Sequence, residues 1–380
     1  MSKHFPKIKK AVKELTPKII SINKEIFKKP ELGFCEFHAS SLLADALREE
    51  GFKVKFGKGK LKTAFEADFD AGLKGGGSKP AVAILAEYDA LPEIGHACGH
   101  NMIAAAAFGA AAAAKRVLGK NCGRLKVIGT PAEEGGGGKV LMIKGGWFKK
   151  IDAAIMVHPA PATRVVGRML AVQSLDFHFY GKASHAAAHP DLGINALDAV
   201  IALFNSVNAM RQQAPDFSRV HGIVTHGGDA PNIIPEYASA RFYVRGITMP
   251  DFRVMLEKIT DCARGAAKSA GCTLKIEKSK ALFHPLEPNR AMGRVYARHM
   301  RAAGLKDGGL GETQNMGSSD IGNLSQIIPT LHPEFAVGNG GAVNHSRDFL
   351  KAVVSRQGEA NMIKAASAMA ATVADLLTDA

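Results

Sequence analysis

The sequence is short of cysteine, of aromatic residues and of long apolar runs, and each shortage excludes a class of protein. Its cysteines are odd in number and scattered, at Cys35, Cys98, Cys122, Cys262 and Cys272, which is not the pattern of a disulfide framework. The longest nearly unbroken apolar run covers residues 102–114, whereas a membrane-spanning helix needs about 20 residues. The basic N-terminal stretch MSKHFPKIKK lacks the apolar core of a secretory signal. We therefore expect a cytoplasmic protein that makes no membrane contact.

Positive charge is in excess, but the features that usually accompany nucleic-acid binding are scarce. The net charge is +14, and a basic surface attracts phosphate. The lysines are nevertheless spread widely, aromatic residues make up only 7% of the chain, and no nucleic-acid-binding motif is present. We expect no nucleic-acid partner. Two interpretations of the positive charge remain open: a surface that is merely solvated, or a weak attraction of a small anionic substrate.

The first half of the chain alternates between strand and helix patterns. A continuous apolar stretch bounded by prolines, residues 80–92, is typical of a strand buried on both faces. An all-apolar helix follows, with Asn101 as its expected N-cap. The other elements are expected as strands at 124–130 and 152–158 and as helices at 8–29, 40–51, 135–146 and 355–378. This order predicts an α/β fold, a mostly parallel sheet with helices on both faces.

The middle of the chain has a different pattern. Residues 173–181 alternate apolar and polar, with Leu175, Phe177 and Phe179 on one face, which indicates a sheet covered on one side only. The elements follow the order β-α-β-β-α-β, and those after the first strand are expected at 193–211, 219–226, 236–245, 250–268 and 272–278. We therefore predict an inserted ferredoxin-like domain, with domain boundaries at 1–172, 173–286 and 287–380.

Polar side chains gather where the strands of the first domain end. Asp89 comes at the end of the first buried strand, and His158 ends the third. Glu133 and Glu134 follow the second strand. Ligands of open α/β sheets bind outside the carboxyl ends of the strands. These side chains, distant in sequence, are therefore expected to converge on one cleft.

The stretch GHACGHNM, residues 95–102, leaves several roles open for Cys98. As a nucleophile it would need a base, which His96 or His100 could supply. As a ligand of structural zinc it would need a second Cys or His pair at regular spacing, and the sequence has none. As a ligand of a catalytic metal it would act with His100, a carboxylate and further histidines, leaving one carboxylate as base. The last hypothesis uses most of the features, and a small core residue is the plain alternative.

Several motifs together resemble one family. EYDALP, GHACGHN, GTPAEEGGGGK, VHP, GKASHAAAHPDLGINALDAV, NIIP and NHSRDF are similar to motifs of the aminoacylase/carboxypeptidase G family of dinuclear metallopeptidases, in its amidohydrolase subgroup. The resemblance runs from KPELGF at 29–34 to NHSRDFL at 344–350. It is greatest to the branches of the Xaa-basic and β-alanyl dipeptidases and of aminobenzoyl-glutamate hydrolase. It implies that the inserted domain is a lid and dimerisation domain.

The resemblance implies roles for individual residues. Each subunit would hold two divalent metal ions, zinc or manganese, through five ligands: Cys98, His100, Glu134, His158 and His345. Glu133 would be the general base acting on a metal-bridging water, and Asp89 would orient a ligand. In the lid, His185 would reach into the partner subunit's site and stabilise the oxyanion. Asn232 and Arg245 would hold the substrate carboxylate.

Two positions depart from the commonest pattern of the subgroup. Glu87 and Asn101 stand where auxin-conjugate hydrolases usually carry aspartates. This weakens the expectation of an auxin-type substrate and leaves the acyl side of the substrate open. His96, His189 and His332 have no role in the resemblance, and we expect them to be structural.

The sequence thus predicts a metal-dependent amidohydrolase that cleaves dipeptides or N-acyl amino acids beside a free carboxylate, as a homodimer joined through the lid. The rival enzyme is an aminobenzoyl-glutamate-type hydrolase, whose substrate is a dianion. A cysteine-nucleophile hydrolase is a further alternative. So is a protein of another class, a binding protein that kept the fold and lost catalysis. Loss of the base would mark such a protein, and Glu133 is present.

Overall fold

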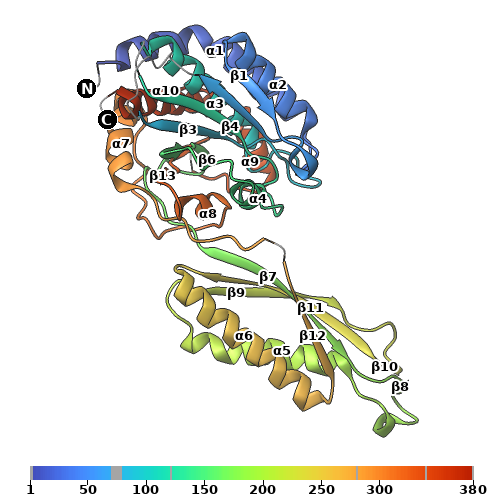
Figure 1. Cartoon of the computed structure of the whole chain (residues 1–380). Coiled ribbons are helices and arrows are strands. Elements are labelled where there is room, and N and C mark those ends of the chain that lie inside the picture. Colours follow the sequence, from blue (N-terminus) through green and yellow to red (C-terminus); the bar gives the residue numbers. More distant parts are fainter. Residues whose placement is uncertain (1–2, 70–78, 120–121, 280, 339, 379–380) are drawn as a thin grey trace. The chain divides into compact units, whose positions relative to one another are not determined.

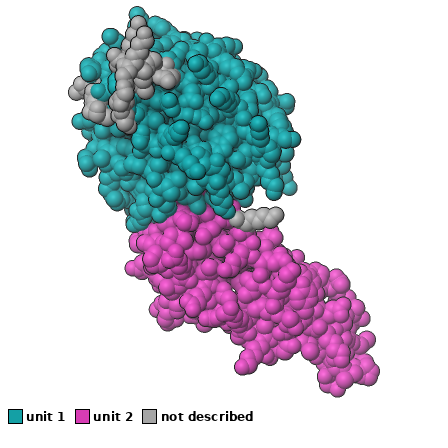
Figure 2. All heavy atoms as spheres, in the orientation of Figure 1, with its two compact units in different colours: residues 1–168, 287–316, 323–380 teal, residues 169–286, 317–322 magenta. Residues whose placement is uncertain are grey.

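The structure is a computed structural model that describes residues 3–69, 79–119, 122–279, 281–338 and 340–378. The chain forms two units (Figure 2): unit 1 comprises Met1–Arg168, Glu287–Met316 and Asn323–Ala380, and unit 2 comprises Met169–Leu286 and Gly317–Gly322. Unit 2 is thus a continuous insertion joined by a short segment from later in the chain. Each unit has a hydrophobic core of its own.

Unit 1 is built on a six-stranded mixed sheet (Figure 1). Its strands are β1 Lys53–Phe56, β2 Phe65–Phe69, β3 Ala81–Ala86, β4 Arg124–Gly129, β5 Ala153–Ile155 and β13 Thr330–Leu331, and a separate parallel pair is formed by β6 His158–Ala160 and β14 Glu334–Ala336. The strand order is β1-β2-β4-β3-β5-β13. β3 is parallel to β4 and β5, and β5 is parallel to β13, whereas β2 is antiparallel to both of its neighbours. The predicted α/β fold with a mostly parallel sheet is confirmed.

Helices cover both faces of this sheet. The helices of unit 1 are α1 Phe5–Lys28, α2 Phe37–Glu49, η1 Gly59–Leu61, α3 His100–Val117, α4 Gly138–Lys144, α7 Arg290–Ala302, α9 Arg347–Ala352 and α10 Arg356–Thr378, and α8 Ile321–Ser325 begins in unit 2 and ends in unit 1. The connection from β3 to β4 and the connection from β4 to β5 cross the sheet in opposite directions. Because such crossovers are right-handed, α3 and α4 lie on opposite faces (Figure 1). Every residue of β3 is accordingly buried.

α3 is the central helix of the unit 1 core. Residues 100–114 are all buried, and the helix packs against α1, α10 and β3. The prediction of Asn101 as N-cap is wrong: the helix begins one residue earlier, and the Asn101 amide donates to Asn23 Oδ1 at 2.7 Å. Among the described residues, no helix combines the length and the apolar character that crossing a bilayer requires.

Parts of unit 1 differ from the sequence prediction. β1 and β2 have no counterpart in it, because KVKF and FEADF are short and mix charged with apolar residues, and so brief an alternation does not stand out from a loop. The strand expected at 80–92 ends at Ala86. The strand expected at 152–158 is split into β5 and β6, so His158 begins a strand instead of ending one.

Unit 2 has a four-stranded antiparallel sheet, a separate two-stranded ribbon, two α-helices and two short 3₁₀ helices. Its strands are β7 Ala171–Tyr180, β8 Ser184–His185, β9 Arg219–His226, β10 Ile233–Ile234, β11 Tyr237–Gly246 and β12 Thr273–Lys278, and its helices are η2 Pro190–Leu192, α5 Ala196–Met210, η3 Arg211–Gln213 and α6 Met249–Ala270. The sheet order is β12-β7-β11-β9, and β8 pairs with β10 in a separate ribbon. The main elements follow the predicted order β-α-β-β-α-β.

One face of the unit 2 sheet packs against α5 and α6. Leu175, Phe177 and Phe179 of β7 are fully buried, whereas the residues between them are partly exposed. The predicted one-sided alternation is confirmed. Local signals set the ends of α6: Thr248 Oγ1 accepts from Asp251 N at 3.2 Å, as an N-cap does, and the left-handed Gly271 ends the helix.

Candidate metal centre

Cys98 and His100 lie where the chain enters α3. Gly99, between them, has φ 83°, a left-handed conformation that favours glycine. A Cβ at this position would lie 2.4 Å from Pro159 Cγ. The glycine therefore lets the loop approach the segment that carries His158. As a result, Cys98 Sγ lies 3.8 Å from His158 Nε2.

The imidazoles of His100 and His158 are oriented through their Nδ1 atoms. His100 Nδ1 lies 2.9 Å from Asp89 Oδ1, and His158 Nδ1 lies 2.7 Å from Pro159 O. Since a carbonyl or carboxylate oxygen accepts, each Nδ1 donates, and in the neutral imidazole, the form that binds a metal ion, Nε2 keeps its lone pair. His100 Nε2 makes no hydrogen bond among the described residues. Histidines that bind metal ions are usually held in this way.

Glu133 and Glu134 lie on an unusual turn after β4. Ala132 has φ 56°, and a left-handed conformation costs a non-glycine residue about 1–2 kcal/mol. Glu134 N donates to Asp89 Oδ2 at 2.9 Å, so Asp89 holds both this turn and His100. Glu133 Oε2 lies 3.9 Å from His100 Nε2.

His345 reaches the site from a distant part of the chain. It also has a positive φ, 65°, and its backbone N donates to Ala97 O at 2.9 Å. Its Nε2 lies 3.3 Å from Glu134 Oε1. The side chain is 51% exposed, so His345 is the candidate ligand that borders the solvent.

The candidate ligand atoms form two groups of three that share one residue. The first group is Cys98, His100 and His158. The second is Cys98, Glu134 and His345. Within each group the ligand atoms lie within 4.8 Å of one another. Because Cys98 belongs to both groups, its sulfur is suited to lie between two cations.

A third group joins Glu133 to the cluster. It contains His100, Glu133 and Glu134, again within 4.8 Å of one another. Glu133 therefore lies beside the two groups that share Cys98 and belongs to neither. The structure thus brings together every site residue that the sequence names in the first domain.

Burial and neighbouring charges together set the pKa values of the cluster. It raises the pKa of the Cys98 thiol, and together with the nearby His100 it lowers the pKa of His158. At Glu134 burial is outweighed by His345 and His100, which lower the pKa of the carboxyl. The histidine is thus neutral and the carboxylate ionised, as metal binding requires. A buried thiol keeps its proton unless a cation stabilises the thiolate.

A buried ion pair that the sequence does not predict lies beside the cluster. Lys139 Nζ donates to Glu87 Oε1 at 2.5 Å, and both side chains are at most 1% exposed. Glu87 Oε2 lies 3.4 Å from His100 Nε2. Burial would raise the pKa of Glu87, but Lys139 and His100 outweigh it and lower the pKa to about 2. The signal in the sequence is the glutamate at 87 together with the lysine that closes GGGGK, and folding brings the two together.

Two of the unassigned histidines lie near the cluster. The ring centroid of His332 is 5.3 Å from that of His158, and burial lowers the pKa of His332 to about 3. Burial and the nearby His100 likewise lower the pKa of His96 to about 3. Both imidazoles are therefore neutral. The third, His189, lies in unit 2, where its backbone N donates to His185 O.

The site residues expected in the inserted domain lie in unit 2 and do not form one cluster. Asn232 O accepts from Ala186 N at 2.9 Å, so Asn232 and His185 are neighbours near the start of β11. Arg245 lies near the end of β11, where its Nη1 donates to Ser318 Oγ at 2.8 Å. β11 has ten residues, and at about 3.3 Å a residue its two ends lie roughly 30 Å apart.

The tautomer of His185 is set by its own loop. Its Nδ1 accepts from Ala187 N at 3.3 Å and from Ala188 N at 3.1 Å. The neutral imidazole therefore carries its proton on Nε2. Because the side chain is exposed, His185 can donate this proton in a hydrogen bond to a group outside unit 2.

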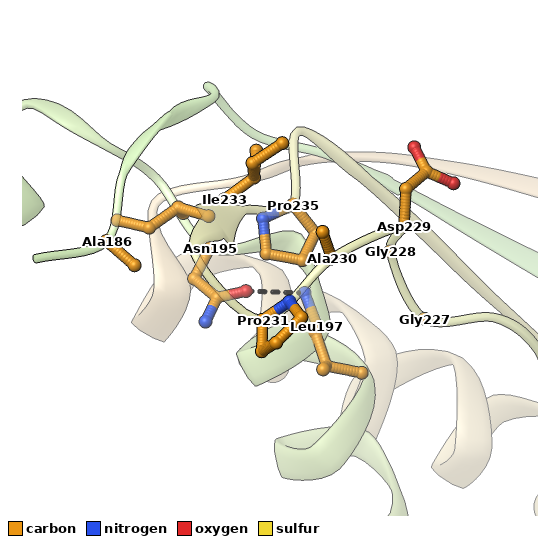
Figure 3. Close-up of a pocket in the computed structure, with 11 residues that line it drawn as sticks. Ala186, Asn195, Leu197, Gly227, Gly228, Asp229, Ala230, Pro231, Ile233 and Pro235 are labelled. Atoms are coloured by element: carbon orange, nitrogen blue, oxygen red, sulfur yellow. Dashed lines mark hydrogen bonds between the residues drawn. The ribbon is translucent and has the colours of Figure 1, made fainter.

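Unit 2 also holds an open cavity of about 350 Å³ beside this loop (Figure 3). It is lined by Ala186, Asn195, Leu197, Gly227, Gly228, Asp229, Ala230, Pro231, Ile233, Ile234 and Pro235. Asn195 Oδ1 accepts from Leu197 N at 3.0 Å and so caps α5 (Figure 3). The lining has one carboxylate and no histidine or cysteine, so this cavity is distinct from the candidate metal centre of unit 1.

Comparison with known proteins identifies relatives over nearly the whole chain. The model of the peptidase family M20/M25/M40 matches residues 83–375. The Xaa-Arg dipeptidase of Mus musculus is 35% identical over 379 residues, which cover 96% of this chain and 87% of the relative. One of the subunits of the p-aminobenzoyl-glutamate hydrolase of Escherichia coli K12 is 34% identical over 328 residues, which cover 81% of this chain and 65% of the relative.

A solved structure shares the fold. A dinuclear metal-binding peptidase of the M20 family from Bacillus subtilis aligns with a TM-score of 0.68 and 20% sequence identity, covering 93% of this chain and 98% of that one. At this identity the likeness shows the fold alone.

Proposed function

Because the chain belongs to the peptidase family M20/M25/M40, we propose that it is a metal-dependent dipeptidase whose catalytic centre is the cluster around Cys98. The family resemblance of its motifs is confirmed, and the chain is an enzyme that hydrolyses amide bonds. The observation that supports placing the catalytic centre at this cluster is the pair of three-ligand groups that share Cys98. The proposed metal ligands are Cys98, His100, Glu134, His158 and His345.

The donor set fits two divalent metal ions. His100 Nε2 is buried and makes no hydrogen bond among the described residues, and in both His100 and His158 it is Nδ1 that donates, so Nε2 is the atom available to a metal ion. Zinc binds sulfur, nitrogen and oxygen ligands in such combinations, and manganese suits the imidazole and carboxylate ligands. We propose zinc or manganese as the ions. The cysteines are all free, which supports a reducing compartment such as the cytoplasm.

In the proposed mechanism, proton transfer is carried out by a residue of unit 1. When bound, the ions polarise the scissile carbonyl and lower the pKa of the attacking water. Glu133 accepts the proton of that water and passes it to the leaving amine. Its carboxylate suits this role because it lies beside the proposed metal ligands but belongs to neither of the two groups that contain Cys98. Asp89 keeps His100 and the Glu134 backbone in place.

We further propose that unit 2 completes the site of a second subunit in a homodimer. His185 would present its Nε2–H to the developing oxyanion, where such donors are most effective. Asn232 and Arg245 would hold the substrate carboxylate. Within one chain they lie near opposite ends of β11, too far apart to hold one carboxylate together. This separation supports a site in which one subunit contributes Asn232 and the other contributes Arg245.

The proposed substrates are dipeptides with a basic C-terminal residue. The support is the similarity to an Xaa-Arg dipeptidase over 96% of the chain. A second candidate is p-aminobenzoyl-glutamate, because the chain is also similar to that hydrolase and its net charge of +14 attracts a dianion. N-acyl amino acids form a third group. A catalytically silent binding protein is disfavoured because Glu133 is in place.

Two matched substitutions test the proposal. Glu133→Gln is expected to keep its metal and to lose about 10²–10⁴-fold in kcat, because only proton transfer is removed. Glu134→Gln is expected to lose metal as well. Activity is measured with zinc or manganese on β-alanyl-arginine, N-acetyl amino acids and p-aminobenzoyl-glutamate, and metal content by elemental analysis. Wild-type protein that stays active in a chelator would indicate the cysteine-nucleophile alternative.

A further inference from the structure

We propose that Glu36 is a positioning residue of the active site, which holds the turn carrying Glu133 and Glu134 in its working geometry. The inference rests on the roles proposed above for these two glutamates. Glu36 is fully buried and directly precedes α2, far in sequence from the turn. Its Oε1 accepts from Ala132 N at 2.8 Å, and its Oε2 accepts from Thr63 Oγ1 at 2.7 Å.

The turn needs such a restraint because of Ala132. Its φ of 56° is unfavourable for alanine and persists only where the surroundings impose it. A Cβ added at Gly33 would lie 2.8 Å from Ala132 Cβ, and one added at Gly136 would lie 2.6 Å from it. The absence of a side chain at Gly33 and Gly136 therefore leaves room for Ala132 in this conformation. Without an acceptor for its buried N–H, Ala132 would lower its conformational energy by adopting a negative φ, and this change would reorient Glu133.

Two buried carboxylates hold the turn on either side of Glu133. Glu36 binds the backbone N–H of Ala132, and Asp89 binds that of Glu134. Glu133 is the residue between these two points, so its direction follows from both. Asp89 is named by the sequence motifs, whereas Glu36 emerges from the structure alone.

Glu36 is not explained by a role in its own helix. It occupies the N-cap position of α2, yet its side chain makes no capping hydrogen bond there. Glu31 fills that role, because its two carboxylate oxygens accept from His38 N at 3.0 Å and from Ala39 N at 2.9 Å. The carboxyl of Glu36 is instead directed to the catalytic turn and to Thr63. Thr63 is itself held, since Tyr88 Oη donates to Thr63 O at 2.5 Å.

The first step of the test compares two substitutions of Glu36 in the metal-loaded enzyme. Glu36→Met keeps the length but removes both acceptors, and we expect kcat to fall about tenfold to hundredfold with KM nearly unchanged. Glu36→Gln can still accept from Ala132 N and donate to Thr63 Oγ1, so it should retain most of the activity. Zinc affinity, measured by competition with a chelator, should fall with Glu36→Met because the Glu134 carboxylate loses its position.

The second step is a rescue. Glycine adopts a φ near 56° without strain, so adding Ala132→Gly to Glu36→Met should restore most of the lost kcat and zinc affinity. Glu31→Met is the matched control, since it removes a neighbouring carboxylate that binds backbone N–H groups of α2. It should lower the melting temperature and leave kcat unchanged. A merely structural role of Glu36 would behave like Glu31 and would not respond to Ala132→Gly.

The outcomes separate this inference from the proposed function. Wild-type kcat and zinc affinity in Glu36→Met, or a double variant no better than Glu36→Met, would overturn the role of Glu36. If Glu36→Met does not fold, Thr63→Val, with and without Ala132→Gly, provides the same rescue test with a smaller initial loss. Glu133→Gln is assayed in parallel: if it is active, the proposed function fails and this inference with it. If it is inactive and the rescue fails, only the role of Glu36 is wrong.

Discussion

Units 1 and 2 present their polar groups in opposite ways. In unit 1 the side chains of Glu87, Asp89, His100 and Lys139 are at most 1% exposed and contact one another. In unit 2 His185 is exposed and is held by its own loop. The sheets differ in the same sense, because β3 is buried along its whole length, whereas β7 is buried on alternate residues.

The difference shows which part of the chemistry one chain can assemble by itself. Buried groups that contact one another are fixed when unit 1 folds, and such preorganised charge is what stabilises a transition state. An exposed donor such as His185 has a hydrogen-bond acceptor only when another surface meets it. The proposed metal centre therefore depends on the fold of unit 1 alone, whereas the proposed contacts of unit 2 depend on the proposed assembly.

The largest expected effect is complementation between two inactive variants. One carries His185→Ala with an intact metal centre, and the other carries Glu133→Gln with an intact unit 2. When they are co-expressed, random pairing makes half of the dimers mixed, and each mixed dimer has one complete site of two, so activity should recover to about one quarter of wild type. Purified mixed dimers without activity would show that His185 acts within its own subunit or not at all.

The next effect concerns ion pairs and is measured by urea denaturation of the metal-free protein. Lys139→Met removes the ammonium partner of the buried Glu87 carboxylate, and we expect a loss of about 3–5 kcal/mol in the free energy of unfolding. Adding Glu87→Gln should recover part of this loss. Arg241→Gln in unit 2 is the matched control: it breaks the pair with Asp176, in which the Arg241 side chain is 52% exposed, and should cost less than about 1 kcal/mol. Equal losses in the two units would contradict the difference between buried and exposed ion pairs.

The smallest effect is on thiol reactivity. Cys98 should be alkylated after chelation and protected by added zinc, because the bound ion engages the sulfur. At free zinc about tenfold above Kd, about a tenth of the sites stay unbound, so the alkylation rate should fall about tenfold. Cys262 of unit 2 is half-buried and serves as the internal control, with a rate that zinc leaves unchanged. Fast alkylation of Cys98 regardless of zinc, with loss of activity, would instead support a nucleophilic thiol.

Hydrophobic periodicity was sufficient to predict the main elements, because it reports local structure. The alternation of Leu175, Phe177 and Phe179 predicted one covered face, and the all-apolar stretch at 102–114 predicted a core helix. The same reasoning failed where the signal was short or ambiguous. β1 and β2 are brief, and Asn101, which resembles a helix cap in the sequence, lies inside α3 and pairs with Asn23.

The chemical groups of this protein could be read from its residues alone: a thiol, histidines and paired glutamates that follow strands, on motifs specific enough to predict the family. Their orientation depends on contacts that form when the chain folds. Asp89 orients the imidazole of His100 and Pro159 O orients that of His158, and Glu36 accepts from the backbone of the turn that carries Glu133. His158 and Pro159 are adjacent in the chain, whereas Glu36 and Ala132 are 96 residues apart. A pattern of neighbouring residues does not encode such a distant partnership, because it arises when packing buries polar groups and each buried donor must meet an acceptor.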